Sequence, residues 1–373
     1  MDDVVRSGTI PSGYSGMLTI DLGALQRNYR TLADRSRPAA TAAVVKADAY
    51  GLGVDQVGPA LQTAGCRDFF VAQFSEAVSL RWLLADEARV YVLNGLQPGE
   101  EATAADLTVI PVLNSLEQLS LWSALAKQRG VMLPALLQVD TGMSRLGLSG
   151  QEVDALAVDR SLAEGVDLRF LMSHLACGDE HAHGQNAEQL AALHRVAALF
   201  PDLPLCLANS GGIFLGHGFH GSLARPGIAL YGGTPSDAPD AAMQPVVRLD
   251  VRVVQTRTVP AGTRIGYGAT YVASAEMRLA TLAAGYADGL PRSLGNTGAA
   301  YYAGVRLPIV GRVSMDSLTI DISALPPSTL RLGSMVEIIG PHQSLEMIAA
   351  DAGTISYEIL TSLGRRYHRH YVV

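Results

Sequence analysis

The stretch LTVIPVLNSLEQLSLWSALAKQRGVMLPALLQVD, residues 107–140, decides the fold class. It holds two short apolar runs, residues 107–113 and 132–140, with a segment of helical period between them. A continuously apolar strand is buried on both faces, and such strands pair in parallel when helices join them. The stretch therefore predicts a strand, a helix and a second parallel strand, the repeating unit of an α/β fold.

The same alternation extends in both directions from this unit. Eight apolar runs separated by helical segments point to a closed (β/α)8 TIM-like barrel rather than an open doubly wound sheet. We therefore expect an α/β fold with a barrel over residues 22–240. The eight runs are residues 41–46, 69–72, 89–94, 107–113, 132–140, 167–175, 204–210 and 223–231.

A second domain is predicted after the barrel. From Pro245 onward, alternating segments such as PVVRLDVRVVQTRTV and short strand-like runs with hardly any helix between them indicate a mostly β C-terminal domain, residues 241–373. Residues 233–245, rich in proline, alanine and aspartate, are the best linker candidate. A strand near residues 18–21 precedes the eight runs, so we expect it to pair outside the barrel.

Composition narrows the class of partner. With 373 residues, 48% of them hydrophobic, the chain can build two domains with sizeable cores. Its net charge of -7 disfavours nucleic acid and anionic membranes and favours a small-molecule ligand. The opening MDDVVRSG lacks the basic start of a signal peptide, and no apolar stretch is long enough to span a bilayer, so we expect a cytoplasmic protein. The three cysteines form no C-x-x-C pair, and we expect neither disulfides nor a metal site.

Polar residues that end the apolar runs mark the expected site, because barrels of this kind bind ligands at the carboxyl ends of their strands. Lys46 ends the first run and is one of only two lysines among 28 basic residues. For His174 or Asp140 alone, a structural role at a strand end is the favoured interpretation. The residues that follow the later runs are Asp140, Arg145, His174, Asn209, Ser210 and Arg225.

Lys46 has two possible roles at the end of a buried strand. It pairs with a carboxylate, or burial and neighbouring cations lower its pKa and make the amine a nucleophile. Such an amine forms a Schiff base with an aldehyde, and pyridoxal phosphate is the aldehyde that enzymes most often hold in this way. The backbone amides of RPGI, residues 225–228, and the Ser210 hydroxyl would suit its phosphate.

Eight motifs carry a resemblance to a known family. In order and spacing they resemble the alanine racemases, fold-type III enzymes that use pyridoxal 5'-phosphate, and the match covers nearly the whole chain. The resemblance implies a barrel, a β domain joined by the N-terminal strand, and a head-to-tail homodimer with shared active sites. It also implies interconversion of L-alanine and D-alanine for cell-wall peptidoglycan or alanine catabolism. The motifs are AVVKADAYGLG, VDTGMSRLG, ANSGG, RPGIALYG, GYGATY, GYADGLPR, GRVSMDS and ISYEILTSLGRRYHR.

The resemblance implies two catalytic bases. Lys46 would carry the cofactor and serve as one base, and Tyr267 of the partner subunit would serve as the other. Racemisation removes a proton from one face of Cα and returns it to the opposite face, which two oppositely placed groups accomplish directly. Arg225 would face the pyridine nitrogen with His174 behind it. Because a guanidinium keeps its proton, the ring would be a weaker electron sink, which disfavours side reactions such as transamination.

The remaining site residues follow from the same resemblance. The substrate carboxylate would be held by Arg145 and by the backbone amide of Met315 of the partner subunit. Tyr286 would narrow the entrance, and a narrow pocket selects a methyl side chain over larger ones. The positions expected to bind the phosphate are Tyr50, Ser210, Gly227, Ile228 and Tyr357.

Gln138 departs from the pattern of the family. Many members carry a carbamylated lysine there, which steers the arginine that binds the carboxylate. Glutamine cannot be carbamylated, although its amide oxygen can accept a hydrogen bond from Arg145. We therefore expect activity that does not depend on carbon dioxide or bicarbonate.

Other interpretations remain beside this one. A broad-specificity or serine racemase would share Lys46 and Tyr267. A pyridoxal-phosphate-binding protein without turnover and a decarboxylase on the same barrel are disfavoured by the motif GYGATY. The segment GDEHAHG, residues 178–184, looks like a metal cluster, but we favour a solvated helix start. For the basic tail RRYHRHY, residues 365–371, we favour domain or dimer contacts over nucleic-acid binding.

Overall fold

The computed structural model describes residues 10–373, and their contacts divide the chain into two compact units. The barrel unit is Ala24–Gln244, and the β unit combines Pro245–Val373 with residues 10–23. The opening stretch MDDVVRSG, on which the expectation about a signal peptide rests, lies outside the described residues.

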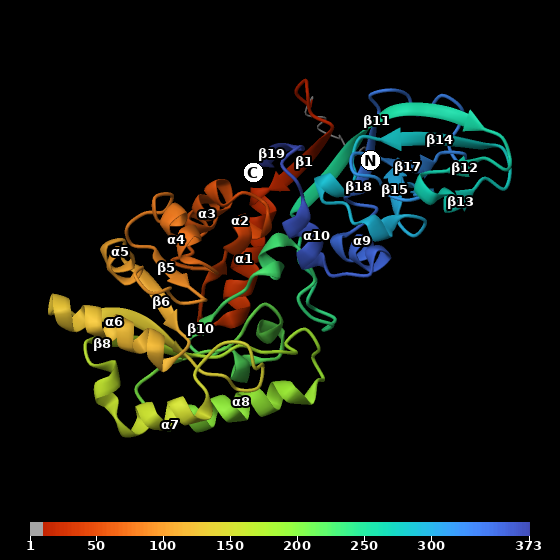
Figure 1. The fold of residues 1–373 in the computed structure, drawn as a ribbon. Coiled ribbons are helices and arrows are strands. Elements are labelled where there is room, and N and C mark those ends of the chain that lie inside the picture. The colour runs from red at the N-terminus through yellow and green to blue at the C-terminus, as the bar shows by residue number, and fades with distance from the viewer. Residues whose placement is uncertain (1–9) are drawn as a thin grey trace. The chain divides into compact units, whose positions relative to one another are not determined.

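The barrel unit is built on parallel strands that follow one another in chain order (Figure 1). Seven strands, β3 to β9, form one sheet, and β10 pairs in parallel with β2, which directly precedes β3. The Val44 amide also donates to the Pro226 carbonyl at 2.9 Å, which joins the end of β10 to β3. The Arg225 amide donates to the Ala208 carbonyl at 2.8 Å, which joins the ends of β9 and β10. Together these contacts close the sheet, and the predicted (β/α)8 TIM-like barrel is confirmed. The strands are β2 (Ala40–Thr41), β3 (Ala43–Val44), β4 (Asp68–Val71), β5 (Arg89–Val92), β6 (Val109–Leu113), β7 (Leu133–Gln138), β8 (Val166–Met172), β9 (Leu205–Cys206) and β10 (Leu223–Ala224).

Helices connect these strands, and α6 shows how the sequence sets their limits. The Ser115 hydroxyl caps its first turn by accepting from the Gln118 amide, and Gly130, with φ of 64°, ends it. Short 3-10 turns, η2 (Gly211–Phe214) and η4 (Ile228–Tyr231), replace longer helices after β9 and β10. The helices are α1 (Leu22–Ser36), α2 (Lys46–Tyr50), α3 (Val54–Thr63), α4 (Phe74–Arg81), α5 (Glu101–Asp106), α6 (Leu116–Arg129), α7 (Gly150–Val158) and α8 (Gly184–Ala197).

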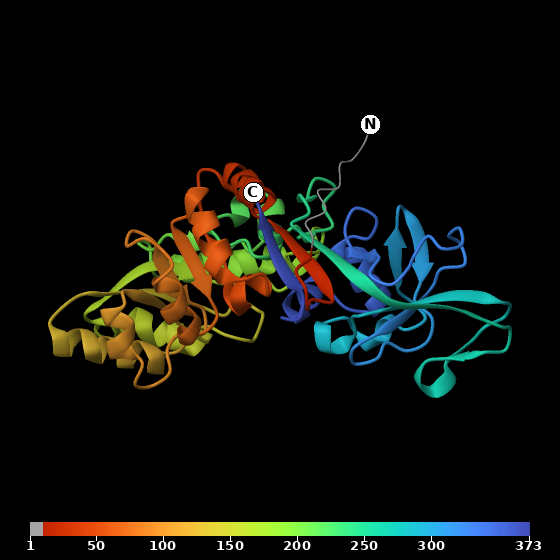
Figure 2. The ribbon, with the colours of Figure 1, turned by 90° about the horizontal axis from the view of Figure 1, so that it is seen from above.

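The β unit is organised around the long strand β11 (Val247–Val259). This strand pairs antiparallel with β1, β14 and β18, and β1 pairs in parallel with β19. The first and last strands of the chain therefore lie side by side (Figure 2). The other elements are β1 (Gly16–Asp21), β12 (Arg264–Ile265), β13 (Tyr271–Val272), β14 (Met277–Leu282), β15 (Ala299–Tyr302), β16 (Val305–Pro308), β17 (Leu318–Asp321), β18 (Met335–Ile339), α9 (Leu345–Ala352), α10 (Ser356–Ser362) and β19 (His368–Val372).

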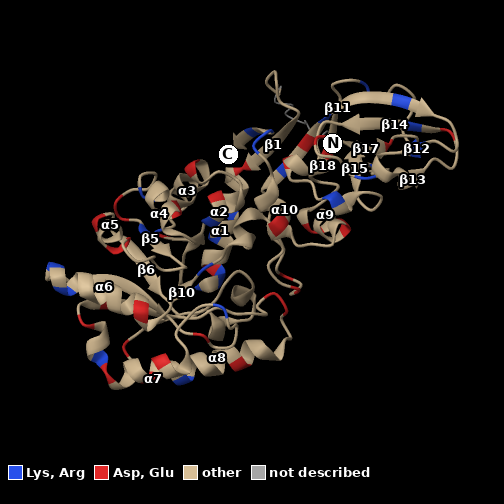
Figure 3. Cartoon of the chain, viewed as in Figure 1, with Lys and Arg blue, Asp and Glu red and all other residues tan. Residues whose placement is uncertain are grey.

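Charged residues occur on the helices of the barrel unit and in the basic tail. Basic and acidic residues are interspersed over the helices of the barrel unit (Figure 3). The basic tail forms β19 and pairs with β1 inside the β unit. His183, from the segment that looked like a metal cluster, is the N-cap of α8 and accepts from the Gln185 amide. Within residues 10–373, no helix is both long enough and apolar enough to cross a membrane.

Candidate active site

The barrel unit brings the predicted strand-end residues to one mouth. Lys46 follows β3, Arg145 lies in the loop after β7, His174 follows β8, Ser210 follows β9 and Arg225 follows β10. The carboxyl ends of all strands in a closed parallel barrel face the same way, so these side chains converge. Their charges act on one another, as the pKa values described below show. The mouth therefore combines an amine, an imidazole, a hydroxyl and two guanidinium groups.

Lys46 begins a backbone turn of unusual handedness. The residues from Ala47 to Tyr50 have φ values of 54°, 55°, 54° and 56°, and Gly51 continues the run at 81°. Left-handed helical backbone costs roughly 1–2 kcal/mol for each residue other than glycine. Four such residues in succession persist only where surrounding contacts over-determine them, and such strain occurs mainly at functional sites.

The amine of Lys46 lies in an environment that favours its neutral form. The side chain is half-buried, and this burial, together with the Arg145 charge, lowers the pKa of the amine, while Glu76 opposes the shift. Within residues 10–373 the amine makes no ion pair or hydrogen bond. Lys127, the other lysine, instead pairs with Glu164 at 2.9 Å. Of the two interpretations of Lys46, the structure favours a reactive amine over a salt-bridged one.

Arg225 is fixed by contacts from two barrel strands, β9 and the end of β8. Its Nη1 donates to the Cys206 carbonyl at 2.8 Å and to Cys206 Sγ at 2.9 Å, and its Nη2 donates to the Ser173 carbonyl at 2.9 Å. The same Nη2 lies 3.4 Å from His174 Nδ1. Burial and the charge of Arg225 lower the pKa of His174 to about 3, so the imidazole is neutral and can accept from the guanidinium.

Ser210 and Gly227 form a small cradle suited to an anion. The Ser210 hydroxyl oxygen accepts from the amides of Gly227, at 2.8 Å, and Ala229, at 3.3 Å. Its own proton makes no hydrogen bond within residues 10–373, so one donor is left for a ligand. A Cβ at position 227 would lie 2.2 Å from the Tyr50 hydroxyl, so only glycine fits there. Because Ile228 follows directly, the predicted phosphate-binding positions of the barrel unit gather at one place, which fits the phosphate of the implied cofactor.

The aromatic ring of Tyr50 is held by its neighbour across the cradle. It stacks on Tyr231 with ring centroids 4.6 Å apart, and the Tyr231 hydroxyl donates to the Val44 carbonyl at 2.9 Å. Val44 is the last residue of β3 and lies two residues before Lys46. The strand that presents the lysine and the ring that lines the cradle are thus parts of one packed cluster.

Gln138 lies near the loop of Arg145 but does not bond to that arginine. The side chain is buried in β7, and its Nε2 donates to the Leu146 carbonyl at 3.2 Å. Within residues 10–373 no hydrogen bond joins Gln138 to Arg145. The hydrogen bond that the Gln138 amide oxygen could accept from Arg145 is therefore not formed here, and Gln138 instead supports the backbone next to Arg145.

The β unit carries the other predicted residues on its surface. Tyr267, in the turn η5 (Tyr267–Ala269), is 72% exposed, and Met315 and Tyr286 are also exposed. Tyr286 and Met315 are neighbours, because the Tyr286 amide donates to the Ser314 carbonyl and the Ala287 amide donates to the Met315 carbonyl, each at 3.0 Å. The structure thus brings Tyr286 and Met315 together.

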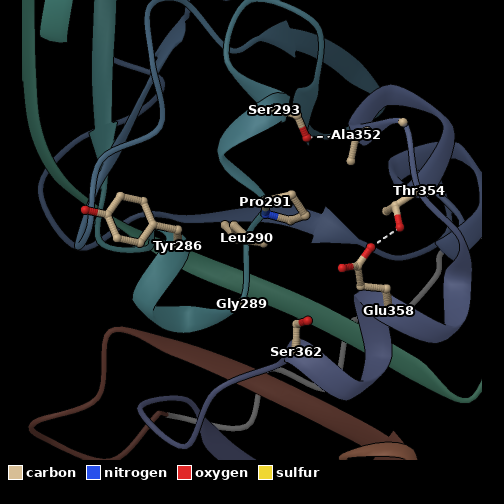
Figure 4. A pocket seen from close by; sticks show the side chains of 10 residues that line it. Tyr286, Gly289, Leu290, Pro291, Ser293, Ala352, Thr354, Glu358 and Ser362 are labelled. Atoms are coloured by element: carbon tan, nitrogen blue, oxygen red, sulfur yellow. Dashed lines mark hydrogen bonds between the residues drawn. The ribbon is translucent and has the colours of Figure 1, made fainter.

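Tyr357 lies in α10, a helix that contributes Glu358 and Ser362 to the lining of a pocket of about 320 Å³ in the β unit (Figure 4). Tyr286 stands at one end of this pocket and Glu358 contributes to its far wall. Hydrogen bonds join Ser293 to the Ala352 carbonyl and Thr354 to Glu358 along the walls. The pocket places α10, with Tyr357, on the same side of the unit as the turn of Tyr286.

Two sets of contacts were missed by the sequence analysis. Glu76 binds two backbone amides at the start of α4 and the amide of Ala47 in the turn after β3. The pattern QFSE, with glutamate three positions after an N-cap, could have revealed the first two contacts. Arg366 binds Asp288 with two hydrogen bonds and Asp316 with a third. No local pattern could have revealed this second set, because its members are far apart in the chain.

Comparison with known proteins places this architecture in a family. The model of the alanine racemase N-terminal domain matches residues 20–235, and that of the alanine racemase C-terminal domain matches residues 246–371. The chain belongs to the alanine racemase family.

Individual relatives agree over the full length. The chain is 60% identical to the catabolic alanine racemase of Agrobacterium fabrum, over 100% of this chain and 96% of that protein. It is 56% identical to the alanine racemase of Brucella canis, over 96% of this chain and 93% of that protein. The crystal structure of alanine racemase from Bartonella henselae with covalently bound pyridoxal phosphate superimposes with a TM-score of 0.93 at 44% identity, covering 96% of this chain and 99% of that one.

Proposed function

We propose that this protein interconverts L-alanine and D-alanine with pyridoxal 5'-phosphate held by Lys46. The observation that carries the proposal is the half-buried Lys46 amine, free of any ion pair among the described residues, at the mouth of a barrel beside an anion cradle. The relatives named above, at 56% and 60% identity, are alanine racemases, and the solved relative from Bartonella henselae holds pyridoxal phosphate covalently.

Each barrel residue has a separate task in this proposal. When bound, pyridoxal phosphate supplies an aldehyde for the amine and an electron-withdrawing ring that acidifies Cα–H. Ser210, Gly227, Ile228 and Tyr50 would hold the phosphate, with Tyr357 of the β unit assisting them. Arg225 would face the ring nitrogen without giving up its proton, while neutral His174 holds the guanidinium in place.

Two groups move the proton on opposite faces of Cα. Lys46 Nζ takes or gives it on one face, which its lowered pKa permits. The phenol oxygen of Tyr267 of the partner subunit acts on the other face. The Arg145 guanidinium orients the substrate carboxylate with the backbone amide of Met315 of the partner subunit, and Tyr286 limits the space for the side chain.

A head-to-tail homodimer is part of the same proposal. Tyr267, Met315 and Tyr286 are exposed on the β unit, although they are apolar or aromatic. Such side chains gain from burial against another surface. A second copy whose barrel mouth receives them would complete both active sites.

The test is proton NMR of L-alanine in deuterated buffer with the protein and pyridoxal phosphate. Exchange of the Cα proton together with formation of D-alanine is the expected result. Exchange with retention of configuration would show that one base works alone and would remove Tyr267 from the mechanism. No exchange of alanine, with cofactor still bound at Lys46, would contradict the assignment of alanine as the substrate.

A further inference from the structure

Glu76 connects the strained turn after Lys46 to the neighbouring strand. Its Oε1 accepts from the Ala47 amide at 2.5 Å. Its Oε2 accepts from the amides of Ala72, at 2.8 Å, and Gln73, at 3.0 Å, at the end of β4. One carboxylate therefore ties the first left-handed residue of the turn to the adjacent strand end.

Other contacts also hold this turn, among them the stacking of Tyr50 on Tyr231. Asp48 stabilises its far end, because its carboxylate accepts from the Val54 amide at 2.8 Å and its carbonyl from the Gly53 amide at 2.9 Å. Ala47, next to the reactive lysine, has a left-handed φ and no side chain that could hold it there. The Glu76 carboxylate is the group that fixes its amide.

We propose that Glu76 is a positioning residue for Lys46: it holds the left-handed turn that aims the amine into the barrel mouth and places a negative charge beside it. This inference rests on the proposed function, in which Lys46 carries the cofactor and moves a proton. Nothing in the known similarity assigns a role to this side chain. The proposal rests on three hydrogen bonds that the Glu76 carboxylate accepts from backbone amides of two separate loops.

The charge of Glu76 has its own effect on Lys46. The groups that act on the amine are Arg145 from the loop after β7, which favours the neutral form, and Glu76 from α4, which favours the protonated form. His174, after β8, is neutral at physiological pH. Removing the Glu76 charge leaves Arg145 unopposed, so the pKa of Lys46 should fall further.

Glu152 provides a matched control inside the same unit. It occupies the same position in the capping box of α7, accepts from the Ser149 amide at 2.9 Å, and accepts from the Leu116 amide of another loop at 3.1 Å. Its contacts resemble those of Glu76, but Glu152 is not among the groups that act on Lys46. Glu152→Gln therefore reports the loss of a helix cap and of one contact with another loop, without a change of charge beside Lys46.

The experiment uses the fact that the chain has only two lysines. The full-length protein without added cofactor is labelled with isotopic methyl groups on both lysines, and their NMR resonances are followed against pH. In Glu76→Gln the Lys46 midpoint should move to lower pH while that of Lys127 stays constant, and in Glu152→Gln neither should move. A Lys46 midpoint that stays in place in Glu76→Gln, with a loss of thermal stability equal to that of Glu152→Gln, would reduce Glu76 to a helix cap and overturn the proposal.

A second variant separates positioning from charge. Glycine adopts a positive φ without strain, so adding Ala47→Gly to Glu76→Gln should restore the turn but not the charge. We expect cofactor to dissociate roughly 10-fold faster from Glu76→Gln, and the added glycine to recover most of that loss while the Lys46 midpoint remains low. Faster dissociation that glycine does not correct would overturn the positioning role. Failure of the unsubstituted protein to bind pyridoxal phosphate at Lys46 would contradict the proposed function instead, and the lysine titration would still test Glu76.

Discussion

The barrel unit and the β unit present their candidate residues in opposite ways. Arg225, Ser210 and Tyr50 are buried and held by hydrogen bonds or stacking inside the barrel unit. Tyr267, Met315 and Tyr286 are exposed on the β unit. A set that is fixed within its own unit is preorganised to bind a cofactor, whereas an exposed set is available to a second molecule. In the proposed function, the barrel unit accordingly builds an active site and the β unit completes the active site of the partner subunit.

The largest effect on activity should come from removing either of the two proposed catalytic bases. Lys46→Ala and Tyr267→Phe should each lower kcat roughly a thousandfold or more, because each removes one acid-base group. If Tyr267 serves the partner's barrel, refolding an equal mixture should restore about a quarter of the normal sites, since half of the dimers are mixed and each has one intact site. The measurement is alanine racemisation by the mixture.

The same mixture can also contradict the proposed division of roles between the barrel unit and the β unit. Each variant refolded alone is the control and should stay inactive. A mixture as inactive as its components would show that Tyr267 acts within its own chain, and the exposed set of the β unit would then need another explanation.

His174 should make the free energy of unfolding of the barrel unit depend on pH. The pKa falls from 6.5 to about 3 on folding, so the folded protein holds the imidazole neutral while the unfolded chain takes up a proton below about pH 6.5. The free energy of unfolding should therefore be highest above pH 6.5 and fall by about 2–4 kcal/mol as the pH drops toward 3. Urea unfolding at several pH values measures this slope.

Substitution isolates the contribution of this histidine. His174→Gln should flatten the slope between pH 6.5 and 3, because glutamine has no proton to gain. The exposed His194 of α8 is the control, and His194→Gln should leave the slope as it was. An unchanged slope in His174→Gln would show that other groups cause the acid sensitivity of the barrel unit.

Two similar ion pairs, one in each unit, allow a finer comparison. Arg89 binds Asp68 in the barrel unit with hydrogen bonds of 2.6 Å and 2.7 Å, and Arg366 binds Asp288 in the β unit with the same two distances. Both aspartates are buried and both arginines are partly exposed. Arg89→Ala and Arg366→Ala should each lower the free energy of unfolding by roughly 1–2 kcal/mol, since the exposed guanidinium groups weaken the pairing.

Arg89→Ala and Arg366→Ala should differ in their effects on activity. Arg366 also binds Asp316, next to Met315, and Asp288 accepts from the Gly285 amide, next to Tyr286. Arg366→Ala should therefore lower kcat/KM roughly fivefold to tenfold by loosening both segments, whereas Arg89→Ala should leave it unchanged. Equal losses of kcat/KM in the two variants would show that activity follows stability alone.

The sequence predicted the barrel well because its signals are local. Each apolar run overlaps a strand, and each strand-end residue is placed by its own run, so Lys46, His174 and Arg225 follow from periodicity and chain order. The helices α9 and α10 were not named, although Ser344 and Gly353 mark the ends of α9 as an N-cap and a left-handed C-cap do elsewhere. The sequence therefore contained the signals for α9, and they were overlooked.

Other features depend on contacts that no local pattern encodes. The left-handed turn after Lys46 is built from alanine, aspartate and tyrosine, and of these alanine and tyrosine have no preference for positive φ. The amide of its first residue, Ala47, is held by Glu76, which comes from the next strand-helix unit. The bond between Arg366 and Asp288 spans 78 positions, so only the folded β unit brings the two together. Sequence analysis located the reactive groups but not the contacts that position them.

The smallest effect concerns Gln138, and here the expected result is no change. Adding bicarbonate should leave the rate of the unsubstituted protein unaltered, because a glutamine amide cannot form a carbamate. In Gln138→Lys, burial would favour the neutral amine that reacts with carbon dioxide, and activity should then respond to bicarbonate. Gln138→Met, of similar length and without a nitrogen, is the control and should not respond. Activation of the unsubstituted protein by bicarbonate would mean that another group in the barrel carries the carbamate, and the neutral contact of Gln138 with the Leu146 carbonyl would no longer explain how Arg145 is supported.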